Sequence, residues 1–216
     1  MKQILLLSAL IFSFNLTTSS QIKKSSLLLG GQISYSDIKT EYKTAQPDQK
    51  NKYADFNISA GTALKENVVL GLSLGFGHTN LDYSYNGVSY INSKSDRYSF
   101  TVFYRQYKKL AKDFYFFGEL GAGYIGSNQT DTDIPSNIKT KYTRSGVQLY
   151  LTPGISYRIY KKLQVELLIP QIGGINYSVL NTKSPVIDSK EDHFGFNTNL
   201  NSSFLSNLAL GFRFVL

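Results

Sequence analysis

The 216-residue chain has no cysteine and only two histidines, His78 and His193. The first absence excludes a disulfide scaffold, a thiolate metal site and the N-terminal cysteine of an anchored lipoprotein. The second narrows the acid-base and nucleophilic schemes that are open to the chain.

Long apolar runs are also scarce. One run stands out, from Ile4 to Leu16, and it is shorter than the roughly 20 residues of a membrane-spanning helix. Lys2 precedes it, and small residues, Thr18 and Ser20, come just before Gln21, which is the build of a secretory signal peptide. We expect a signal peptide over residues 1–20 and one domain over residues 21–216. Export without cysteine suggests a bacterial envelope.

The net charge is +8, but the lysines are scattered through polar segments and turns and do not form a concentrated basic patch. Together with the export signal, this scatter argues against a nucleic-acid partner.

Aromatic residues and glycine are abundant, with 16 Tyr, 14 Phe and 17 Gly. Beyond the N-terminal run no segment has the period of an amphipathic helix, whereas about eight segments alternate with period 2. Their apolar series span Leu27 to Tyr35, Phe56 to Leu64, Val68 to Phe76, Tyr98 to Tyr104, Phe114 to Tyr124, Val147 to Tyr157, Leu163 to Ile169, and Phe204 to Leu216. The pattern predicts an all-β protein.

The connections between these segments alternate in length. Long polar segments at 39–52, 84–96, 127–142 and 178–203 take turns with tight links at 65–67, 108–113 and 159–162. This is typical of an antiparallel up-and-down transmembrane β-barrel of about eight strands, with an apolar outer band and a more polar interior. A soluble sandwich also alternates, but it has no reason to sort its loops by length.

One change of phase predicts a β-bulge. Outward residues are even-numbered up to Phe76, whereas Leu81 and its alternating neighbours are odd-numbered, on the way to a hairpin turn at Asn86-Gly87. The expected pairs across that hairpin are Tyr85 with Val88 and Tyr83 with Tyr90. Since a one-residue slip reverses every side chain, we predict a bulge between about His78 and Asn80.

Prolines interrupt two later segments. Pro153 lies inside the sixth segment and removes a ladder donor, so we expect a bulge or a local gap there. Pro170 and Gly173-Gly174 break the phase of the seventh.

The predicted inward face carries charges of both signs. An isolated buried charge is costly and Arg binds a carboxylate in a bidentate manner, so these side chains should pair inside the narrow lumen. The lumen charge network is expected to contain Asp55, Arg97, Arg105, Glu119, Arg144, Arg158, Glu166 and Arg213. The single pair we name is Glu119 with Arg105. Our main interpretation is a structural plug; a narrow gated pore and a catalytic role are the alternatives.

No motif predicts a catalytic residue, a cofactor or a metal. "GAGYIG" at 121–126 matches the dinucleotide pattern, but no helix follows to receive a pyrophosphate. A hydrolase at the outer surface would use His193 with Asp192 or Glu191 and a serine such as Ser189, although a solvated polar loop explains these residues better. The acidic residues of the same loop, which include Asp188, lack EF-hand spacing.

The mature chain resembles small bacterial outer-membrane β-barrels of the OmpA transmembrane-domain and OmpX kind, and especially the outer-membrane β-barrel domain proteins of Bacteroidota. The resemblance rests on the export signal, the rhythm of strands and loops, "GAGY", "LTPGISYRI" and the closing "LALGFRFVL". It implies an outer-membrane location, contact with outer-membrane lipid and lipopolysaccharide, and a last strand that the barrel-assembly machinery reads. That strand presents Leu208, Leu210, Phe212, Phe214 and Leu216 to lipid, with Leu216 where the family usually ends in Phe.

Four functions follow as hypotheses. The first is a non-enzymatic barrel with a structural or binding role in the envelope, displaying extracellular loops. The second is a narrow pore for small or apolar solutes, the third a lipopolysaccharide-modifying enzyme, and the fourth, by analogy alone, a secretion accessory protein. A lumen blocked by ion pairs favours the first, a continuous wet lumen the second, and a serine within hydrogen-bond reach of His193 the third.

Overall fold

The computed structural model describes residues 22–41, 47–85, 88–198 and 208–216. The predicted signal peptide and the Asn86-Gly87 turn lie outside these residues. The described chain forms antiparallel strands and contains no helix long and apolar enough to cross a membrane. The strands are β1 (Leu27–Thr40), β2 (Asp48–Lys65), β3 (Val68–Tyr85), β4 (Val88–Lys109), β5 (Phe114–Asp133), β6 (Ile138–Tyr160), β7 (Leu163–Leu168), β8 (Gly173–Lys183), β9 (Asp188–Thr198) and β10 (Ala209–Val215).

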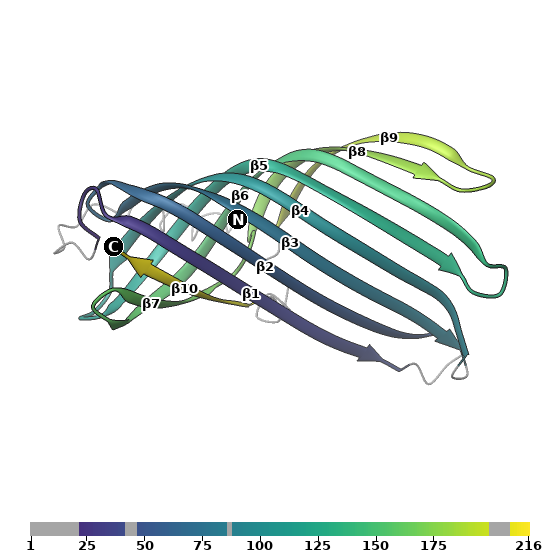
Figure 1. Ribbon diagram of the computed structural model, residues 1–216, viewed down its shortest axis with the longest axis horizontal. Coiled ribbons are helices and arrows are strands. Elements are labelled where there is room, and N and C mark those ends of the chain that lie inside the picture. The colour runs from purple at the N-terminus through teal and green to yellow at the C-terminus, as the bar shows by residue number, and fades with distance from the viewer. Residues whose placement is uncertain (1–21, 42–46, 86–87, 199–207) are drawn as a thin grey trace, which may run out of the picture.

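Eight of these strands close into a ring, in the order β1-β2-β3-β4-β5-β6-β7-β10 (Figure 1). The ring closes where β10 pairs with β1, from Leu28 opposite Val215 to Ile33 opposite Leu210. The long strand β6 pairs with β7 along one part and with β8 along another, so β8 and β9 extend the wall rather than add to the ring. The predicted eight-stranded antiparallel barrel is confirmed.

The strands are strongly staggered. From Ile33, the paired residues lead through β2 and β3 to Tyr98 on β4; in the other direction they lead through β10, β7, β6 and β5 to Lys108, ten residues further along the same strand. In a closed barrel such a stagger requires tilted strands and fixes the diameter, and eight strands leave an interior that side chains can fill.

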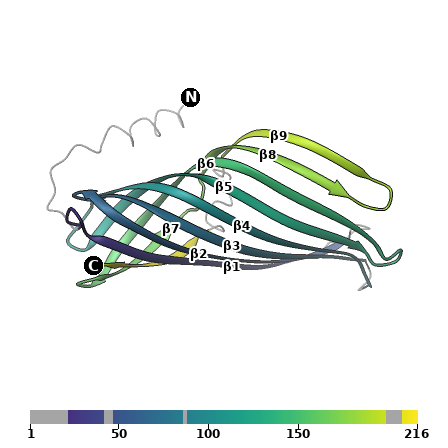
Figure 2. The ribbon, with the colours of Figure 1, turned by 45° about the horizontal axis from the view of Figure 1, so that its top comes forward.

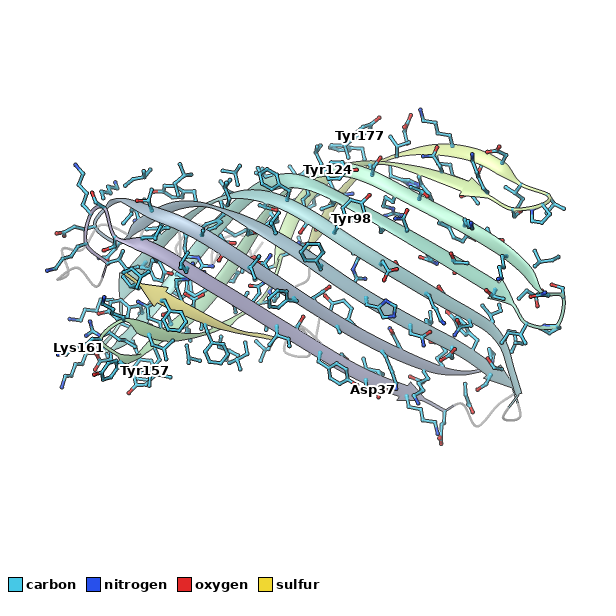
Figure 3. The ribbon with its side chains drawn as sticks, viewed as in Figure 1. Asp37, Tyr98, Tyr124, Tyr157, Lys161 and Tyr177 are labelled. Atoms are coloured by element: carbon cyan, nitrogen blue, oxygen red, sulfur yellow. The ribbon has the colours of Figure 1, made fainter. Side chains whose placement is uncertain are left out.

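The alternation predicted from the sequence separates the outside from the inside. Outward residues of β3, such as Leu72 and Phe76, are half exposed, while Val69 on the other phase is fully buried. Tyr98, Tyr124 and Tyr177 lie along one border of the outward apolar band, and Tyr157 lies with Lys161 near the opposite end of the barrel (Figure 3). Aromatic side chains at both borders of an apolar band are typical of membrane barrels.

Glycines let bulky inward side chains fit. A Cβ at Gly121 would stand 2.3 Å from Cζ of Tyr150, and one at Gly71 would stand 2.5 Å from both the Ala60 carbonyl oxygen and Cζ of Phe103. Both approaches are closer than real Cβ contacts, so the packing of this interior depends on glycine at these positions.

The end of the barrel with the tight turns has an apolar floor. Buried side chains from β1 to β5 pack together here with Ile22, which precedes the first strand: Leu28, Ala63, Val69, Tyr107, Tyr115 and Phe117. The same apolar cluster continues further from the tight turns through Phe103, Leu168 and Ala209 on β4, β7 and β10. The Ile22 amide donates to Oδ1 of Asn67 at 3.2 Å, and the Asn67 amide donates back to the Ile22 carbonyl at 3.0 Å. The segment after the predicted signal peptide is therefore bound beneath the β2–β3 turn.

The polar segments predicted as long loops are mostly strand. Adjacent strands continue as paired ribbons well past the apolar band, and together they form a curved extension on the side away from the tight turns (Figures 1 and 2). Our expectation of long loops was wrong in this respect: outside lipid both faces of a strand meet water, so polar sequence continues the ladder as well as apolar sequence does.

The wall of this extension is not closed by the described residues. Beyond Ile33, β1 pairs with β2 alone, and β9 pairs with β8 alone. The two strands border the extension on opposite sides in both views (Figures 1 and 2). Closure is thus found at the level of the apolar band, where lipid would offer no partner to an open edge.

The predicted bulge between His78 and Asn80 is wrong. Both ladders of β3 run through this stretch without a shift. The phase changes later, between Tyr83 and Ser84, so that Tyr83 faces Ile91 and not Tyr90, while Tyr85 faces Val88 as expected. The physical reason is again the environment. Beyond the apolar band the outward face needs no apolar residues, so the alternation of apolar residues no longer predicts which face a side chain is on.

The gap predicted at Pro153 is present on one side. Toward β5 the ladder is intact, with Pro153 opposite Gly118. Toward the other neighbour, pairing with β7 ends at Gly154 and pairing with β8 begins at Leu151. Pro153 therefore lies where β6 changes partner, and its missing N–H interrupts no ladder there.

Candidate functional site

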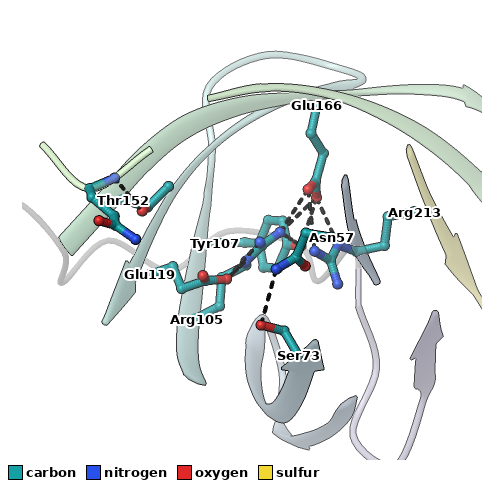
Figure 4. A network of polar contacts seen from close by, with 9 residues as sticks. Asn57, Ser73, Arg105, Tyr107, Glu119, Thr152, Glu166 and Arg213 are labelled. Carbon is teal, nitrogen blue, oxygen red and sulfur yellow. Dashed lines mark hydrogen bonds and ion pairs between the residues drawn. The ribbon is translucent and has the colours of Figure 1, made fainter. Parts of the chain in front are cut away.

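A buried cluster of four charged residues lies above the apolar floor, with Glu166 at its centre (Figure 4). Nη1 of Arg105 donates to both carboxylate oxygens of Glu166, at 2.9 and 2.8 Å, and Nε of Arg213 donates to Oε1 at 2.9 Å. Nε of Arg105 donates to Glu119 at 2.8 Å. Strands β4, β5, β7 and β10 each supply one charge, so the cluster ties together strands from different parts of the ring.

Aromatic rings surround the central arginine. The Arg105 guanidinium lies 4.3 Å from the centroid of the Phe117 ring, and Nη1 also donates to the Tyr107 hydroxyl at 3.1 Å. That hydroxyl in turn donates to Glu166 at 3.1 Å. Arg105 is 3% exposed and Glu166 2%. Removal of two or more charges from water is costly unless they pair and hydrogen-bond, and here nearly every polar atom does.

Arg213 is the exception within the cluster. Its Nη1 is buried and has no hydrogen-bond partner among the described residues. Gly30 makes room for its guanidinium, since a Cβ there would stand 3.1 Å from Cζ of Arg213. The cluster borders a cavity of about 70 Å³ whose lining includes Tyr150, Gln148 and Thr101.

The predicted network of eight charges is divided in the structure. Arg105, Glu119, Glu166 and Arg213 meet, and the named pair of Arg105 with Glu119 is present. Asp55 and Arg97 form a separate pair at 3.2 Å. Our placement of the remaining two in the network was wrong. Arg158 binds Asp113 of the β4–β5 turn at 2.7 Å, and Arg144 lies exposed on the extension, without an ion pair in the described part of the chain. Alternation predicts the face of the strand on which a residue lies but not its position along the barrel axis. Arg144 and Arg158 lie towards opposite ends of β6, away from the level of the cluster.

Sequence reasoning missed the aromatic and amide partners. Tyr107, Phe117 and Gln164 are all on the inward phase, and Gln164 accepts a hydrogen bond from Ser156 at 2.9 Å. The phase of β4 and β5 places Tyr107 and Phe117 inside, so this signal was available. The part played by Ile22 had no such signal, because it precedes the first alternating run.

The candidate hydrolase residues do not form a catalytic arrangement. Asp192 lies on the opposite face of β9 from His193 and accepts from the Tyr177 hydroxyl at 3.4 Å. Glu191 is 3.4 Å from Nε2 of His193. Ser178 faces His193 across the ladder, but its buried hydroxyl has no hydrogen-bond partner among the described residues. Ser189 lies four residues before His193 on the same strand, about 13 Å away. Among the described residues there is also no group of three or more His, Asp or Glu that could hold a metal ion.

The last strand places its residues as the sequence predicts. Leu210, Phe212 and Phe214 are about half exposed on the outer face, and Arg213 is buried inside. Both backbone bonds between Leu216 and Leu27 are made, at 2.8 and 3.1 Å, so the final residue is paired.

The sequence model of the family described as outer membrane protein beta-barrel domain matches residues 5–214. The chain belongs to this family. Members and similar structures are bacterial outer-membrane proteins, and in such barrels the tight turns face the periplasm and the longer connections face outwards. A comparison with curated sequences finds no match.

Similar solved structures are outer-membrane proteins too. A major outer membrane protein from Thermus thermophilus is 10% identical with a TM-score of 0.50, and the alignment covers 89% of this barrel and 99% of that chain. OprG from Pseudomonas aeruginosa is 10% identical, with a TM-score of 0.44 and coverage of 92% and 99%. The translocator domain of the autotransporter NalP from Neisseria meningitidis is 15% identical, with a TM-score of 0.43; the alignment covers 90% of this barrel but 65% of that chain.

Proposed function

We propose that this outer-membrane barrel is a non-enzymatic envelope protein whose lumen is closed by the Arg105, Glu119, Glu166 and Arg213 cluster. The observation that carries the proposal is the pairing of these four buried charges across the interior. Directly below them the apolar floor fills the periplasmic end. A charged solute entering this region would have to separate ion pairs in a poorly solvated environment, which costs several kcal/mol, by the usual estimate for buried charges.

In this proposal the extracellular extension is the surface that has the structural or binding role. Its strands are paired and carry polar side chains on both faces, so these side chains are held in fixed positions. Exported by its signal peptide and inserted by the barrel-assembly machinery, the protein would belong with the small OmpA-like and OmpX-like barrels of Bacteroidota envelopes.

Single-channel conductance of the refolded protein in planar bilayers tests the proposal, with the native chain compared with Arg105→Ala and Glu119→Ala. We expect a silent native protein and discrete steps in the variants, because truncation opens a water path beside the remaining charges. Steady conductance of the native protein would contradict a closed lumen.

The second candidate is a narrow pore, favoured by the cavity of about 70 Å³ beside the cluster. In that case the ion pairs would act as a gate, and the native protein would conduct.

A further inference from the structure

A shallow groove of about 420 Å³ lies across β1 to β4, at the extracellular border of the apolar band. By alternation, the outer-face members of its lining are Ile33, Tyr35, Ala54, Phe56, Phe76, His78 and Asp96. Ala54 lies opposite Tyr35 on one neighbouring strand and opposite His78 on the other. The hollow exists because this small residue is surrounded by large ones.

The lower wall of the groove is apolar and continuous with the lipid-facing band. Phe56 and Phe76 face each other across the β2–β3 ladder, with 50% and 56% of their surface exposed. Tyr35, which is 68% exposed, flanks them on β1. An alkyl chain lying here would cover exposed aromatic surface without leaving the hydrocarbon layer.

The upper wall is polar. Nδ1 of His78 and Oδ1 of Asp96 lie 2.7 Å apart on adjacent strands. The outer face changes from Phe76 to His78 within two residues of β3, and from Tyr98 to Asp96 within two residues of β4, so the groove spans the boundary between hydrocarbon and head groups.

The next row of outer-face residues, towards the extracellular end, contains two cationic side chains. Lys52, Asn80 and Lys94 face one another there on β2, β3 and β4. Lys94 has no ion-pair partner among the described residues, and the nearest carboxylate oxygen to Nζ of Lys52 belongs to Asp37, at 4.0 Å. Asn80 accepts a hydrogen bond from Asn92 at 3.1 Å with its carbonyl oxygen, which leaves its amide group to donate. Two ammonium groups flanking an amide form a suitable contact for a phosphate.

We propose that this groove binds one phosphorylated glycolipid of the outer leaflet, of the lipid A class. An acyl chain lies along Phe56 and Phe76, the sugar packs on Tyr35 beside Ala54, and a phosphate lies over Asn80 between Lys52 and Lys94. Free phosphate would make no use of the apolar wall, and a simple phospholipid would make no use of the sugar-sized hollow. The inference rests on the proposed membrane placement but not on the closed lumen.

Binding of lipid A to the purified protein in detergent tests this, with dephosphorylated lipid A and phosphatidylglycerol as comparison ligands and Kd as the readout. Since each surface lysine attracts anionic lipid, the Lys52→Ala/Lys94→Ala double variant should bind lipid A about tenfold or more weakly. Ala54→Phe should also weaken binding, because it fills the hollow.

The matched control is Lys139→Ala/Lys141→Ala, which removes two outward lysines from β6, away from the groove. We expect its affinity for lipid A to be close to native. Equal losses in both double variants, or equal affinities for lipid A and phosphatidylglycerol, would overturn the proposal in favour of unspecific attraction. Conductance should be the same in all these variants as in the native chain, so failure here is distinguishable from failure of the closed lumen.

Discussion

Glu166 is the residue on which the interior cluster depends most. It accepts hydrogen bonds from Arg105, Arg213 and Tyr107. Glu166→Gln would leave two buried guanidinium groups with one carboxylate, and loss of one partner from a buried pair costs about 3 kcal/mol or more. We expect the free energy of unfolding in urea, measured in lipid vesicles, to fall by about that amount.

The control for this substitution is Arg158→Gln at the pair with Asp113. Both side chains of that pair are about one-third exposed, so its loss should cost less than about 1 kcal/mol. An equal loss of unfolding free energy in the two variants would show that burial does not strengthen the ion pairs of the cluster.

Two glycines offer a second comparison between single residues. An added methyl at Gly71 would meet backbone atoms of Ala60 and Gly61, whereas nothing lies within 4 Å of the same position at Gly118. Gly71→Ala should therefore lower the free energy of unfolding by about 1–3 kcal/mol, and Gly118→Ala should change it by less than about 0.5 kcal/mol. Urea titrations of both variants give the answer, and an undisturbed Gly71→Ala would refute the close packing described for β2 and β3.

At the scale of elements, the hairpin of β5 and β6 extends well beyond the apolar band. From Asn128 opposite Thr143 to Asp133 opposite Ile138 its pairs lie in the extension. Replacement of residues 128–143 by Asn-Gly should leave the barrel intact, because the pairs at the level of lipid remain. Resistance to SDS at room temperature, read as a mobility shift on heating, measures this.

Deletion of Gln164 alone is the contrasting change. It would move the rest of β7 by one residue relative to the tight turn at 161–162 and turn Glu166 towards lipid, so we expect the heat-dependent shift to disappear. If the short deletion were tolerated and the long one were not, the assignment of the lipid-spanning segments would be wrong.

Elements were predictable where lipid constrains the outer face of a strand and the narrow interior constrains the inner face. From Val68 to Phe76 every second residue had to be apolar, so strand, phase and exposure followed from the sequence. From His78 onward that constraint ends, and the predicted bulge failed for this reason. The ion-pair cluster was partly predictable in the same sense: phase placed Arg105 and Glu119 inside, but which carboxylate binds Arg213 depends on the ten-residue stagger, and no local pattern encodes the stagger.

The whole molecule depends on its last strand. Deletion of Ala209–Leu216 would leave β1 and β7 without the partner that joins them. We expect the truncated chain to give no heat-shifted barrel after refolding into detergent micelles. A truncated chain that stayed soluble and folded without detergent would contradict the membrane barrel.

The seam between β1 and β10 also sets an order in time. Leu28 is opposite Val215, which lies 187 positions later in the chain, so the ring cannot close before β10 has been synthesised. Closure of so long a loop is slow, and until it happens the sheet has two open edges that other strands can join. We therefore expect the chain to be most prone to pairing with other strands between the synthesis of β10 and the formation of the six residue pairs that join β10 to β1.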